Sequence, residues 1–100
     1  MEDLVSLSEI TADDFSPHLN STFRLTRDGR PDSDLTLIDV RAVGKGNGRQ
    51  PFSLQFTGTP GEVLPQHIYR ISHDRMGVMD IFIVPVAATA DHTQYEAIFN

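Results

Sequence analysis

Residues 52–57 read Phe-Ser-Leu-Gln-Phe-Thr, and this stretch decides the class of fold. Its bulky apolar side chains alternate with polar ones, so every second residue has the same character. In an extended strand, successive side chains point to opposite faces of the sheet. The alternation therefore predicts a β-strand with one buried face and one face in water.

Further segments of the chain carry strand patterns of the same or a related kind. They are residues 22–26, 35–43, 68–73, 78–86 and 94–99. The first and last of them alternate, whereas the segment at 78–86 is apolar almost throughout. A nearly continuous apolar run is typical of a strand that is buried on both faces or strongly bent.

Turn-forming residues separate these segments, for example at residues 28–32, 44–48 and 58–61. Six strands with short connections fit an antiparallel meander. Closure into a small barrel, or folding into a compact sandwich, would protect the exposed sheet edges. We therefore predict a mainly all-β single domain over residues 1–100. The glycine-rich stretch at 44–48 is predicted as a mobile hairpin tip.

One short helix is predicted near the start of the chain. Thr11 can cap its N-terminus, and Asp13 and Asp14 suit the positive end of the helix dipole. Pro17 limits the helix to one or two turns. We expect Phe15 to close one open end of the barrel and residues 1–8 to form a flexible arm.

The inward faces of the predicted strands, together with the helix, define a core. Its predicted members are Phe15, Phe23, Leu25, Phe52, Leu54, Phe56, Tyr69, Phe82, Val84 and Phe99. His67, His73 and Tyr95 are predicted as interface residues instead. The last strand has two open interpretations: it closes the barrel, or it forms a sheet edge that pairs with a partner chain by strand addition.

The composition excludes several classes of protein. A chain of 100 residues, 39% of them hydrophobic, allows one folded domain but not two. Without cysteine there is no disulfide and no thiolate metal ligand. The net charge of −6 disfavours nucleic-acid binding, because phosphates repel an acidic surface. An acidic start and the absence of a long apolar run predict a soluble chain, cytoplasmic at synthesis, without signal peptide or membrane insertion.

No constellation of residues points to catalysis or to a cofactor. The histidines lack the spacing that places two imidazoles on one metal ion. Ser72, His73 and Asp74 are consecutive, and neighbours on a strand point to opposite faces, which prevents a catalytic relay. The glycines at 44–48 precede a strand, not the helix that a phosphate-binding loop requires. We therefore predict no catalytic residue, no metal and no cofactor.

Several short motifs, together with the helix-like segment at residues 15–23, extend over nearly the whole chain. They are Pro-Phe-Ser-Leu-Gln-Phe at 51–56, Leu-Pro-Gln-His-Ile-Tyr-Arg at 64–70, His73, Gly77, Phe-Ile-Val-Pro-Val at 82–86 and Tyr-Glu-Ala-Ile-Phe-Asn at 95–100. In this order and spacing they resemble a family of short bacterial domains of unknown function. The resemblance implies a structural or assembly role, in the company of phage-tail-collar-like proteins, and it transfers no catalytic residue.

The function favoured by these observations is a non-catalytic interaction or assembly module, with a protein partner or self-association. The resemblance implies an accessory structural role in a phage-tail-like or fibre-like assembly. The alternative is a small-ligand-binding β-barrel, although six strands around several phenylalanines leave little internal space. A small hydrolase that uses His73 and Asp74 is the least favoured alternative.

Overall fold

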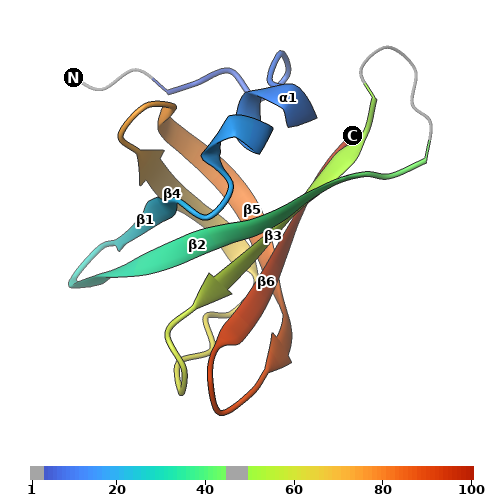
Figure 1. Cartoon of the computed structure of the whole chain (residues 1–100). Helices are drawn as coiled ribbons and strands as arrows, with labels where there is room; N and C mark the ends of the chain where they lie inside the picture. Colours follow the sequence, from blue (N-terminus) through green and yellow to red (C-terminus); the bar gives the residue numbers. More distant parts are fainter. Residues whose placement is uncertain (1–3, 45–49) are drawn as a thin grey trace.

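The computed structural model describes residues 4–44 and 50–100 of the chain (Figure 1). These residues form the strands β1 (Thr22–Arg27), β2 (Arg30–Ala42), β3 (Phe52–Gly58), β4 (His67–His73), β5 (Gly77–Ala88) and β6 (Thr93–Phe99). The short helix α1 (Ala12–Phe15) and the 3-10 turn η1 (Ser16–His18) precede them. The strands close into an antiparallel barrel in the order β1-β2-β3-β6-β5-β4. The predicted all-β class and the helix are confirmed, and the barrel is formed instead of the sandwich.

The strand order departs from a simple meander at one place. β1-β2-β3 and β4-β5-β6 are each three-stranded meanders, and they are joined where β3 pairs with β6 and β1 pairs with β4. Residues 59–66 cross from the first meander to the second at the lower end of the barrel in Figure 1. The turn signal at 58–61 marks this break correctly, but turn residues do not indicate which strand lies beside the next one.

The two meanders are built alike. In each, the middle strand is long, and its first half pairs with the preceding strand while its second half pairs with the following one. A register shift accompanies the change of partner, between Leu37 and Asp39 in β2 and between Pro85 and Ala87 in β5. A β-bulge bends a strand and increases its twist. These two bends help the strands to curl into a closed barrel.

Apolar side chains fill the interior of the barrel. The buried residues are Ile10, Phe15, Phe23, Leu25, Leu35, Leu37, Phe52, Leu54, Phe56, Leu64, Tyr69, Ile71, Met79, Ile81, Ile83, Tyr95, Ala97 and Phe99. α1 lies at the upper end of the barrel (Figure 1), and its buried Phe15 packs there with its ring centroid 5.8 Å from that of Phe99 and 5.9 Å from that of Phe52. Thr11 begins the helix with a backbone N–H that donates to the Asp14 carboxylate (2.8 Å). The expected place of the helix is thus confirmed.

Two of the ten predicted core residues do not lie in the core. Phe82 is 50% exposed, and Val84 is only half-buried. The inward positions of β5 belong to Met79, Ile81 and Ile83 instead. Because both faces of this strand are apolar, its sequence carries no alternation that would reveal which face points inward.

Tyr95 is not an interface residue, because its side chain is 1% exposed. It shares the inward parity of Ala97 and Phe99. Its hydroxyl accepts a hydrogen bond from the Leu64 N–H (3.0 Å) and donates one to the Glu62 carbonyl (3.3 Å). Tyr95 therefore anchors the segment that crosses between the meanders.

The start of the chain differs from the predicted flexible arm. Residues 1–3 lie outside the described residues, but Leu4 forms a parallel bridge with Val78 of β5. The Val5 N–H donates to the Val78 carbonyl (2.8 Å), and Leu7 packs against the core. Residues 4–8 therefore lie against the barrel. The hairpin tip predicted at 44–48 falls outside the described residues except for its first glycine.

Candidate interaction surface

A cross-strand ion pair marks equivalent positions on the outer faces of the two meanders. On β1 and β2, Arg24 lies opposite Asp34, with 3.6 Å between Nε and Oδ1. On β4 and β5, Arg70 lies opposite Asp80, with 3.1 Å between the same atoms. Exposed pairs of this kind contribute little stability. They do allow the neighbouring outward side chains of the two meanders to be compared position by position.

Beside the first ion pair, the outward positions hold threonines. Thr22 of β1 lies opposite Thr36 of β2, and Thr36 lies opposite Thr57 of β3. We call these residues the threonine row. A β-branched side chain with a hydroxyl suits a pleated surface that faces water. This half of the barrel closes without large apolar side chains at these outward positions.

At the equivalent positions the second meander holds large apolar side chains. Ile68 of β4 lies opposite Phe82 of β5, and Ile98 of β6 lines the same groove. We call these residues the apolar row, and their exposed fractions are 59%, 50% and 57%. Single exposed apolar residues are ordinary on a protein surface. A contiguous set on adjacent strands is typical of an interaction site.

A groove of about 390 Å³ lies along the apolar row, where β5 and β6 separate. The ladder between these strands ends at the Val84–Glu96 pair, and beyond it they diverge toward the upper end of the barrel (Figure 1). We call this space the seam. Residues 80–82 line one side of it, residues 98–100 line the other, and residues 7–8 border it as well. The groove therefore lies on the outside of the barrel, between two strands that are not paired with each other at this level.

An extended segment already pairs with β5 near this groove. β4 occupies one edge of β5 at Val78, through its pairing with Ser72. The bridge from Leu4 and the hydrogen bond from Val5 must then lie on the opposite edge, which faces the seam. The arm turns away at residues 6–9. The edge of β5 that faces the seam thus accepts an extended backbone, and the arm covers only its beginning.

The predicted interface residues do not share one surface. His67 is exposed at the start of β4, where its ring lies edge-on to Tyr69 with 5.3 Å between centroids. His73 lies at the other end of the same strand, and its ring packs 4.6 Å from that of His18. Tyr95 points into the barrel. The sequence does not reveal the apolar row, because Phe82 lies in a nearly continuous apolar run that predicts a buried strand.

His73 holds the β4–β5 turn against η1. Its Nδ1 accepts hydrogen bonds from the N–H groups of Arg75 (3.0 Å) and Met76 (3.3 Å). Its Nε2 lies 2.9 Å from the Ser21 hydroxyl, which donates to the His18 carbonyl (2.5 Å). The neutral ring therefore carries its proton on Nε2 and donates it to Ser21. Burial, and next the neighbouring His18, lower the pKa of His73. With both nitrogens engaged, His73 is poorly placed to act as a general base.

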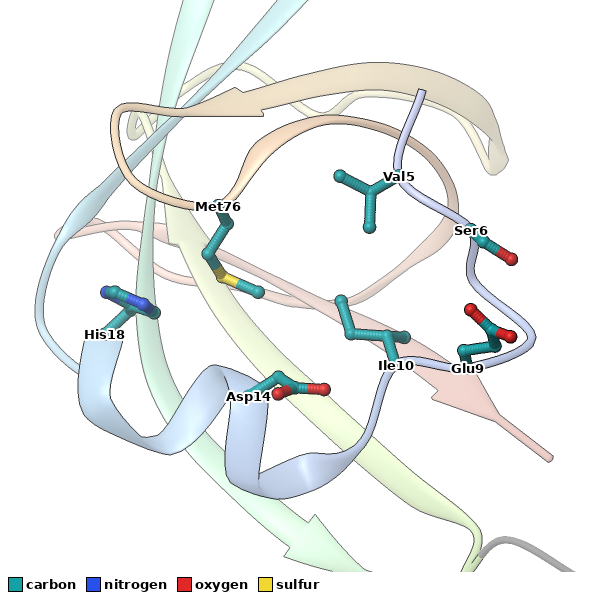
Figure 2. A pocket seen from close by; sticks show the side chains of 7 residues that line it. All are labelled: Val5, Ser6, Glu9, Ile10, Asp14, His18 and Met76. Carbon is teal, nitrogen blue, oxygen red and sulfur yellow. The ribbon is translucent and has the colours of Figure 1, made fainter. Parts of the chain in front are cut away.

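A second hollow, of about 420 Å³, lies between the arm, α1 and the β4–β5 turn (Figure 2). Val5, Ile10 and Met76 form its apolar wall, and the carboxylates of Glu9 and Asp14 lie at its rim. The Asp14 carboxylate already accepts the hydrogen bond that caps α1. In the described part of the chain, no three His, Asp or Glu side chains are placed to hold a metal ion.

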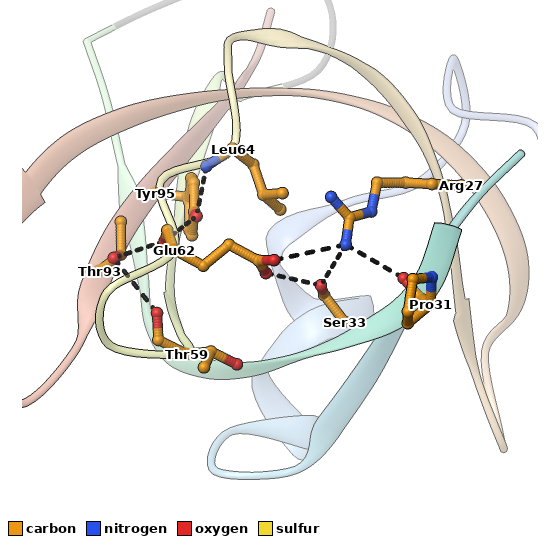
Figure 3. Close-up of polar contacts among 8 residues, drawn as sticks. All are labelled: Arg27, Pro31, Ser33, Thr59, Glu62, Leu64, Thr93 and Tyr95. Carbon is orange, nitrogen blue, oxygen red and sulfur yellow. Dashed lines mark hydrogen bonds and ion pairs between the residues drawn. The ribbon is translucent and has the colours of Figure 1, made fainter. Parts of the chain in front are cut away.

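The lower end of the barrel is closed by a polar network around Glu62 (Figure 3). The Glu62 carboxylate accepts hydrogen bonds from the hydroxyl of Ser33 (2.9 Å) and from Nη2 of Arg27 (3.5 Å). Its backbone carbonyl accepts one from the Thr93 hydroxyl (2.8 Å). Because Phe15 closes the upper end, the barrel is filled and covered at both ends. This packing argues against a ligand site inside the barrel.

Comparisons with known proteins place this fold in a family. The family described as Domain of unknown function (DUF6916) matches residues 10–99, which include α1 and every strand from β1 to β6. Neither the curated proteins nor the solved structures gave a match. Within residues 4–44 and 50–100, no helix is long and apolar enough to cross a membrane. Because the match covers most of its length, the chain belongs to the DUF6916 family.

Proposed function

We propose that this protein is a non-catalytic interaction module and that the apolar row is its contact surface. The observation that carries the proposal is the contrast between the two rows. The threonine row occupies the equivalent place in the first meander, so the architecture itself does not demand Ile68, Phe82 and Ile98 on the outside. Exposed apolar side chains in contiguous sets typically serve binding. An aromatic residue near the centre of such a set is a common energetic anchor of an interface.

The charges around the row suit an interface with an apolar centre and a polar rim. Arg70 and Asp80 lie next to the row and neutralise each other across the strands. On the β6 side, the Glu96 carboxylate accepts a hydrogen bond from the Gln55 amide (2.8 Å). A partner would therefore bury few uncompensated charges at the centre of the contact.

We also propose a protein partner or a second copy as the bound molecule, and not a nucleic acid, because the net charge of the chain is −6. The family resemblance adds the proposal of an accessory structural role in a phage-tail-like or fibre-like assembly, with synthesis in the cytoplasm. The alternative of a ligand-binding barrel receives little support, since buried apolar side chains occupy the interior of the barrel.

Photo-crosslinking in cells that contain the chain's natural neighbours would test this function. A photoreactive phenylalanine analogue at position 82 should give one dominant cross-linked product, mapped by mass spectrometry to a defined segment. The Ile68→Thr and Ile98→Thr variants should weaken it. Position 38 of β2 is the matched control, because Ile38 is also apolar and 41% exposed. The same products from positions 82 and 38 would refute the proposed contact surface.

A further inference from the structure

Resting on the proposed function, we infer what kind of molecule the apolar row receives: an extended segment of a protein partner, which enters the seam and pairs with the exposed edge of β5. The segment is neutral or basic, and apolar at alternate positions. Strand addition of this kind takes its affinity from backbone hydrogen bonds and its specificity from side-chain pockets.

The first argument is the direction of the backbone groups of β5. The Val78 carbonyl faces the seam, because it accepts the hydrogen bond from Val5. In an antiparallel ladder, alternate residues direct their N–H and C=O groups to the same edge. The backbone N–H and C=O groups of Asp80 and Phe82 are therefore directed at the seam too. The ladder with β6 starts only at Val84, so this stretch borders the groove instead of a paired strand.

The second argument is that the chain's own arm shows the pairing on a small scale. Leu4 and Val5 lie beside Val78 as an extended backbone, parallel to β5. The arm then turns, with the Glu9 N–H directed at the Ser6 carbonyl (3.4 Å). A partner segment would continue along β5 where the arm leaves it.

The third argument is the shape of the groove. Its floor includes Ile81 and Phe99, which are 1% and 7% exposed, and its walls include Phe82 and Ile98. Successive side chains of an extended segment point to opposite sides. Every second side chain of the partner segment would thus meet this apolar floor, which predicts an apolar residue at alternate positions.

The fourth argument concerns charge and area. Asp80 lines the groove, and the net charge of −6 repels an acidic segment. The same charge disfavours a second copy.

Each half-exposed side chain of the row offers on the order of 100 Å². The row therefore offers roughly 300 Å², whereas a stable dimer buries about 800 Å² on each partner. A short strand that also forms backbone hydrogen bonds fits the available surface better than a second barrel does.

The test is selection from a display library of short randomised peptides on the full chain, with counter-selection on the Phe82→Thr variant. Enriched peptides should show apolar residues at alternate positions and few acidic ones. Amide NMR shifts caused by a selected peptide should concentrate at residues 80–82 and 98–100. Phe82→Thr should weaken binding roughly tenfold or more, as expected for the loss of an aromatic anchor. Ile38→Thr should leave binding unchanged.

Three outcomes would overturn the inference. Peptides with apolar residues at helical spacing, or shifts centred on the hollow beside α1, would exclude an extended segment in the seam. Self-association of the chain that Phe82→Thr abolishes would make a second copy the occupant. The peptide result and the self-association result would both leave the proposed interaction function intact. That function fails only if cross-linking does not distinguish positions 82 and 38. Selection without enrichment over the Phe82→Thr variant would also refute the extended-segment partner. Ile98→Thr provides a second variant if Phe82→Thr does not fold.

Discussion

β2 and β5 are the long strands of their meanders, and each passes from one neighbour to the other through a register shift. Their inward residues are similarly apolar, with Leu35 and Leu37 in β2 and Ile81 and Ile83 in β5. Their outward residues differ, since one meander carries the threonine row and the other the apolar row. Because the inward faces are alike, packing of the interior does not account for the difference between the outward faces, and we propose that this difference reflects binding.

The largest expected effect tests the inward face. Phe56 of β3 is fully buried, and its ring centroid lies 5.5 Å from that of Phe23. Phe56→Ala should lower the free energy of unfolding by about 3–5 kcal/mol, because it removes a large buried side chain and leaves a cavity. Urea or thermal unfolding measures the loss. The control is Phe82→Ala, an equal truncation of a half-exposed ring. Similar losses in the two variants would contradict the assignment of inward and outward faces.

The next effect tests the segment that joins the meanders. Tyr95→Phe removes the hydroxyl that accepts from the Leu64 N–H and donates to the Glu62 carbonyl. The expected cost is about 1–2 kcal/mol, because a buried N–H then lacks its acceptor. Unfolding in urea provides the measurement, and the cross-linking yield at position 82 should not change. A loss of partner contact without a loss of stability would restore Tyr95 as an interface residue.

A smaller effect concerns His73, which links η1 to the second meander. Burial, and next His18, lower the pKa of His73 in the folded protein, so the unfolded chain binds more protons at mildly acidic pH. This contribution to stability is complete above the ordinary histidine pKa of about 6.5. It is lost as the pH falls from there through the lowered pKa, because protonation removes the acceptor of the Arg75 and Met76 N–H groups.

Unfolding measured across this pH range should therefore show a slope that the His73→Gln variant flattens. His67→Gln is the control, because His67 is exposed at the start of the same strand. An unchanged slope in His73→Gln would show that the titration of another group dominates the acid side of the stability profile.

The sequence predicts the fold well where one face of a strand is polar. Strict alternation in β3 identifies Phe52, Leu54 and Phe56 as inward residues, and the same reasoning holds for Phe23 and Leu25 in β1. The expectation that the other face of β3 lies in water is wrong, because Ser53 and Gln55 are only 2% and 3% exposed. The reasoning from alternation fails in β5, where the outward residues are apolar as well. The apolar run predicts a core strand, although it combines a buried inward face with an exposed apolar outward face.

Local sequence patterns do not predict the seam or the strand order, for a different reason. The pairing of β3 with β6 joins residues about 40 positions apart, such as Leu54 and Ala97. No turn signal encodes such a pairing, because it depends on how the whole sheet closes. The groove follows from the place where the β5–β6 ladder ends, after Val84 and Glu96. Local signals in the last strand therefore leave two interpretations open, a closing barrel strand or a sheet edge, and only the closed sheet shows that β6 lies between β3 and β5.

The smallest expected effect on stability gives the sharpest test of the comparison. Phe82→Thr installs the residue type that Thr36 has in the first meander, and the reverse change, Thr36→Phe, places a ring on the threonine row. Both sites face outward, so each change should alter the free energy of unfolding by only about 0.5 kcal/mol. Peptide binding should nevertheless weaken roughly tenfold or more in Phe82→Thr, and the added ring of Thr36→Phe should not create a second binding site. The seam is absent beside Thr36, where the ladder with β3 continues through the Thr36–Thr57 pair.

If Thr36→Phe alone acquired binding, an exposed ring would suffice for binding and the groove would be unnecessary. If Phe82→Thr instead unfolded the barrel, the apolar row would belong to the stabilising core, and the two meanders would differ in their folding requirements.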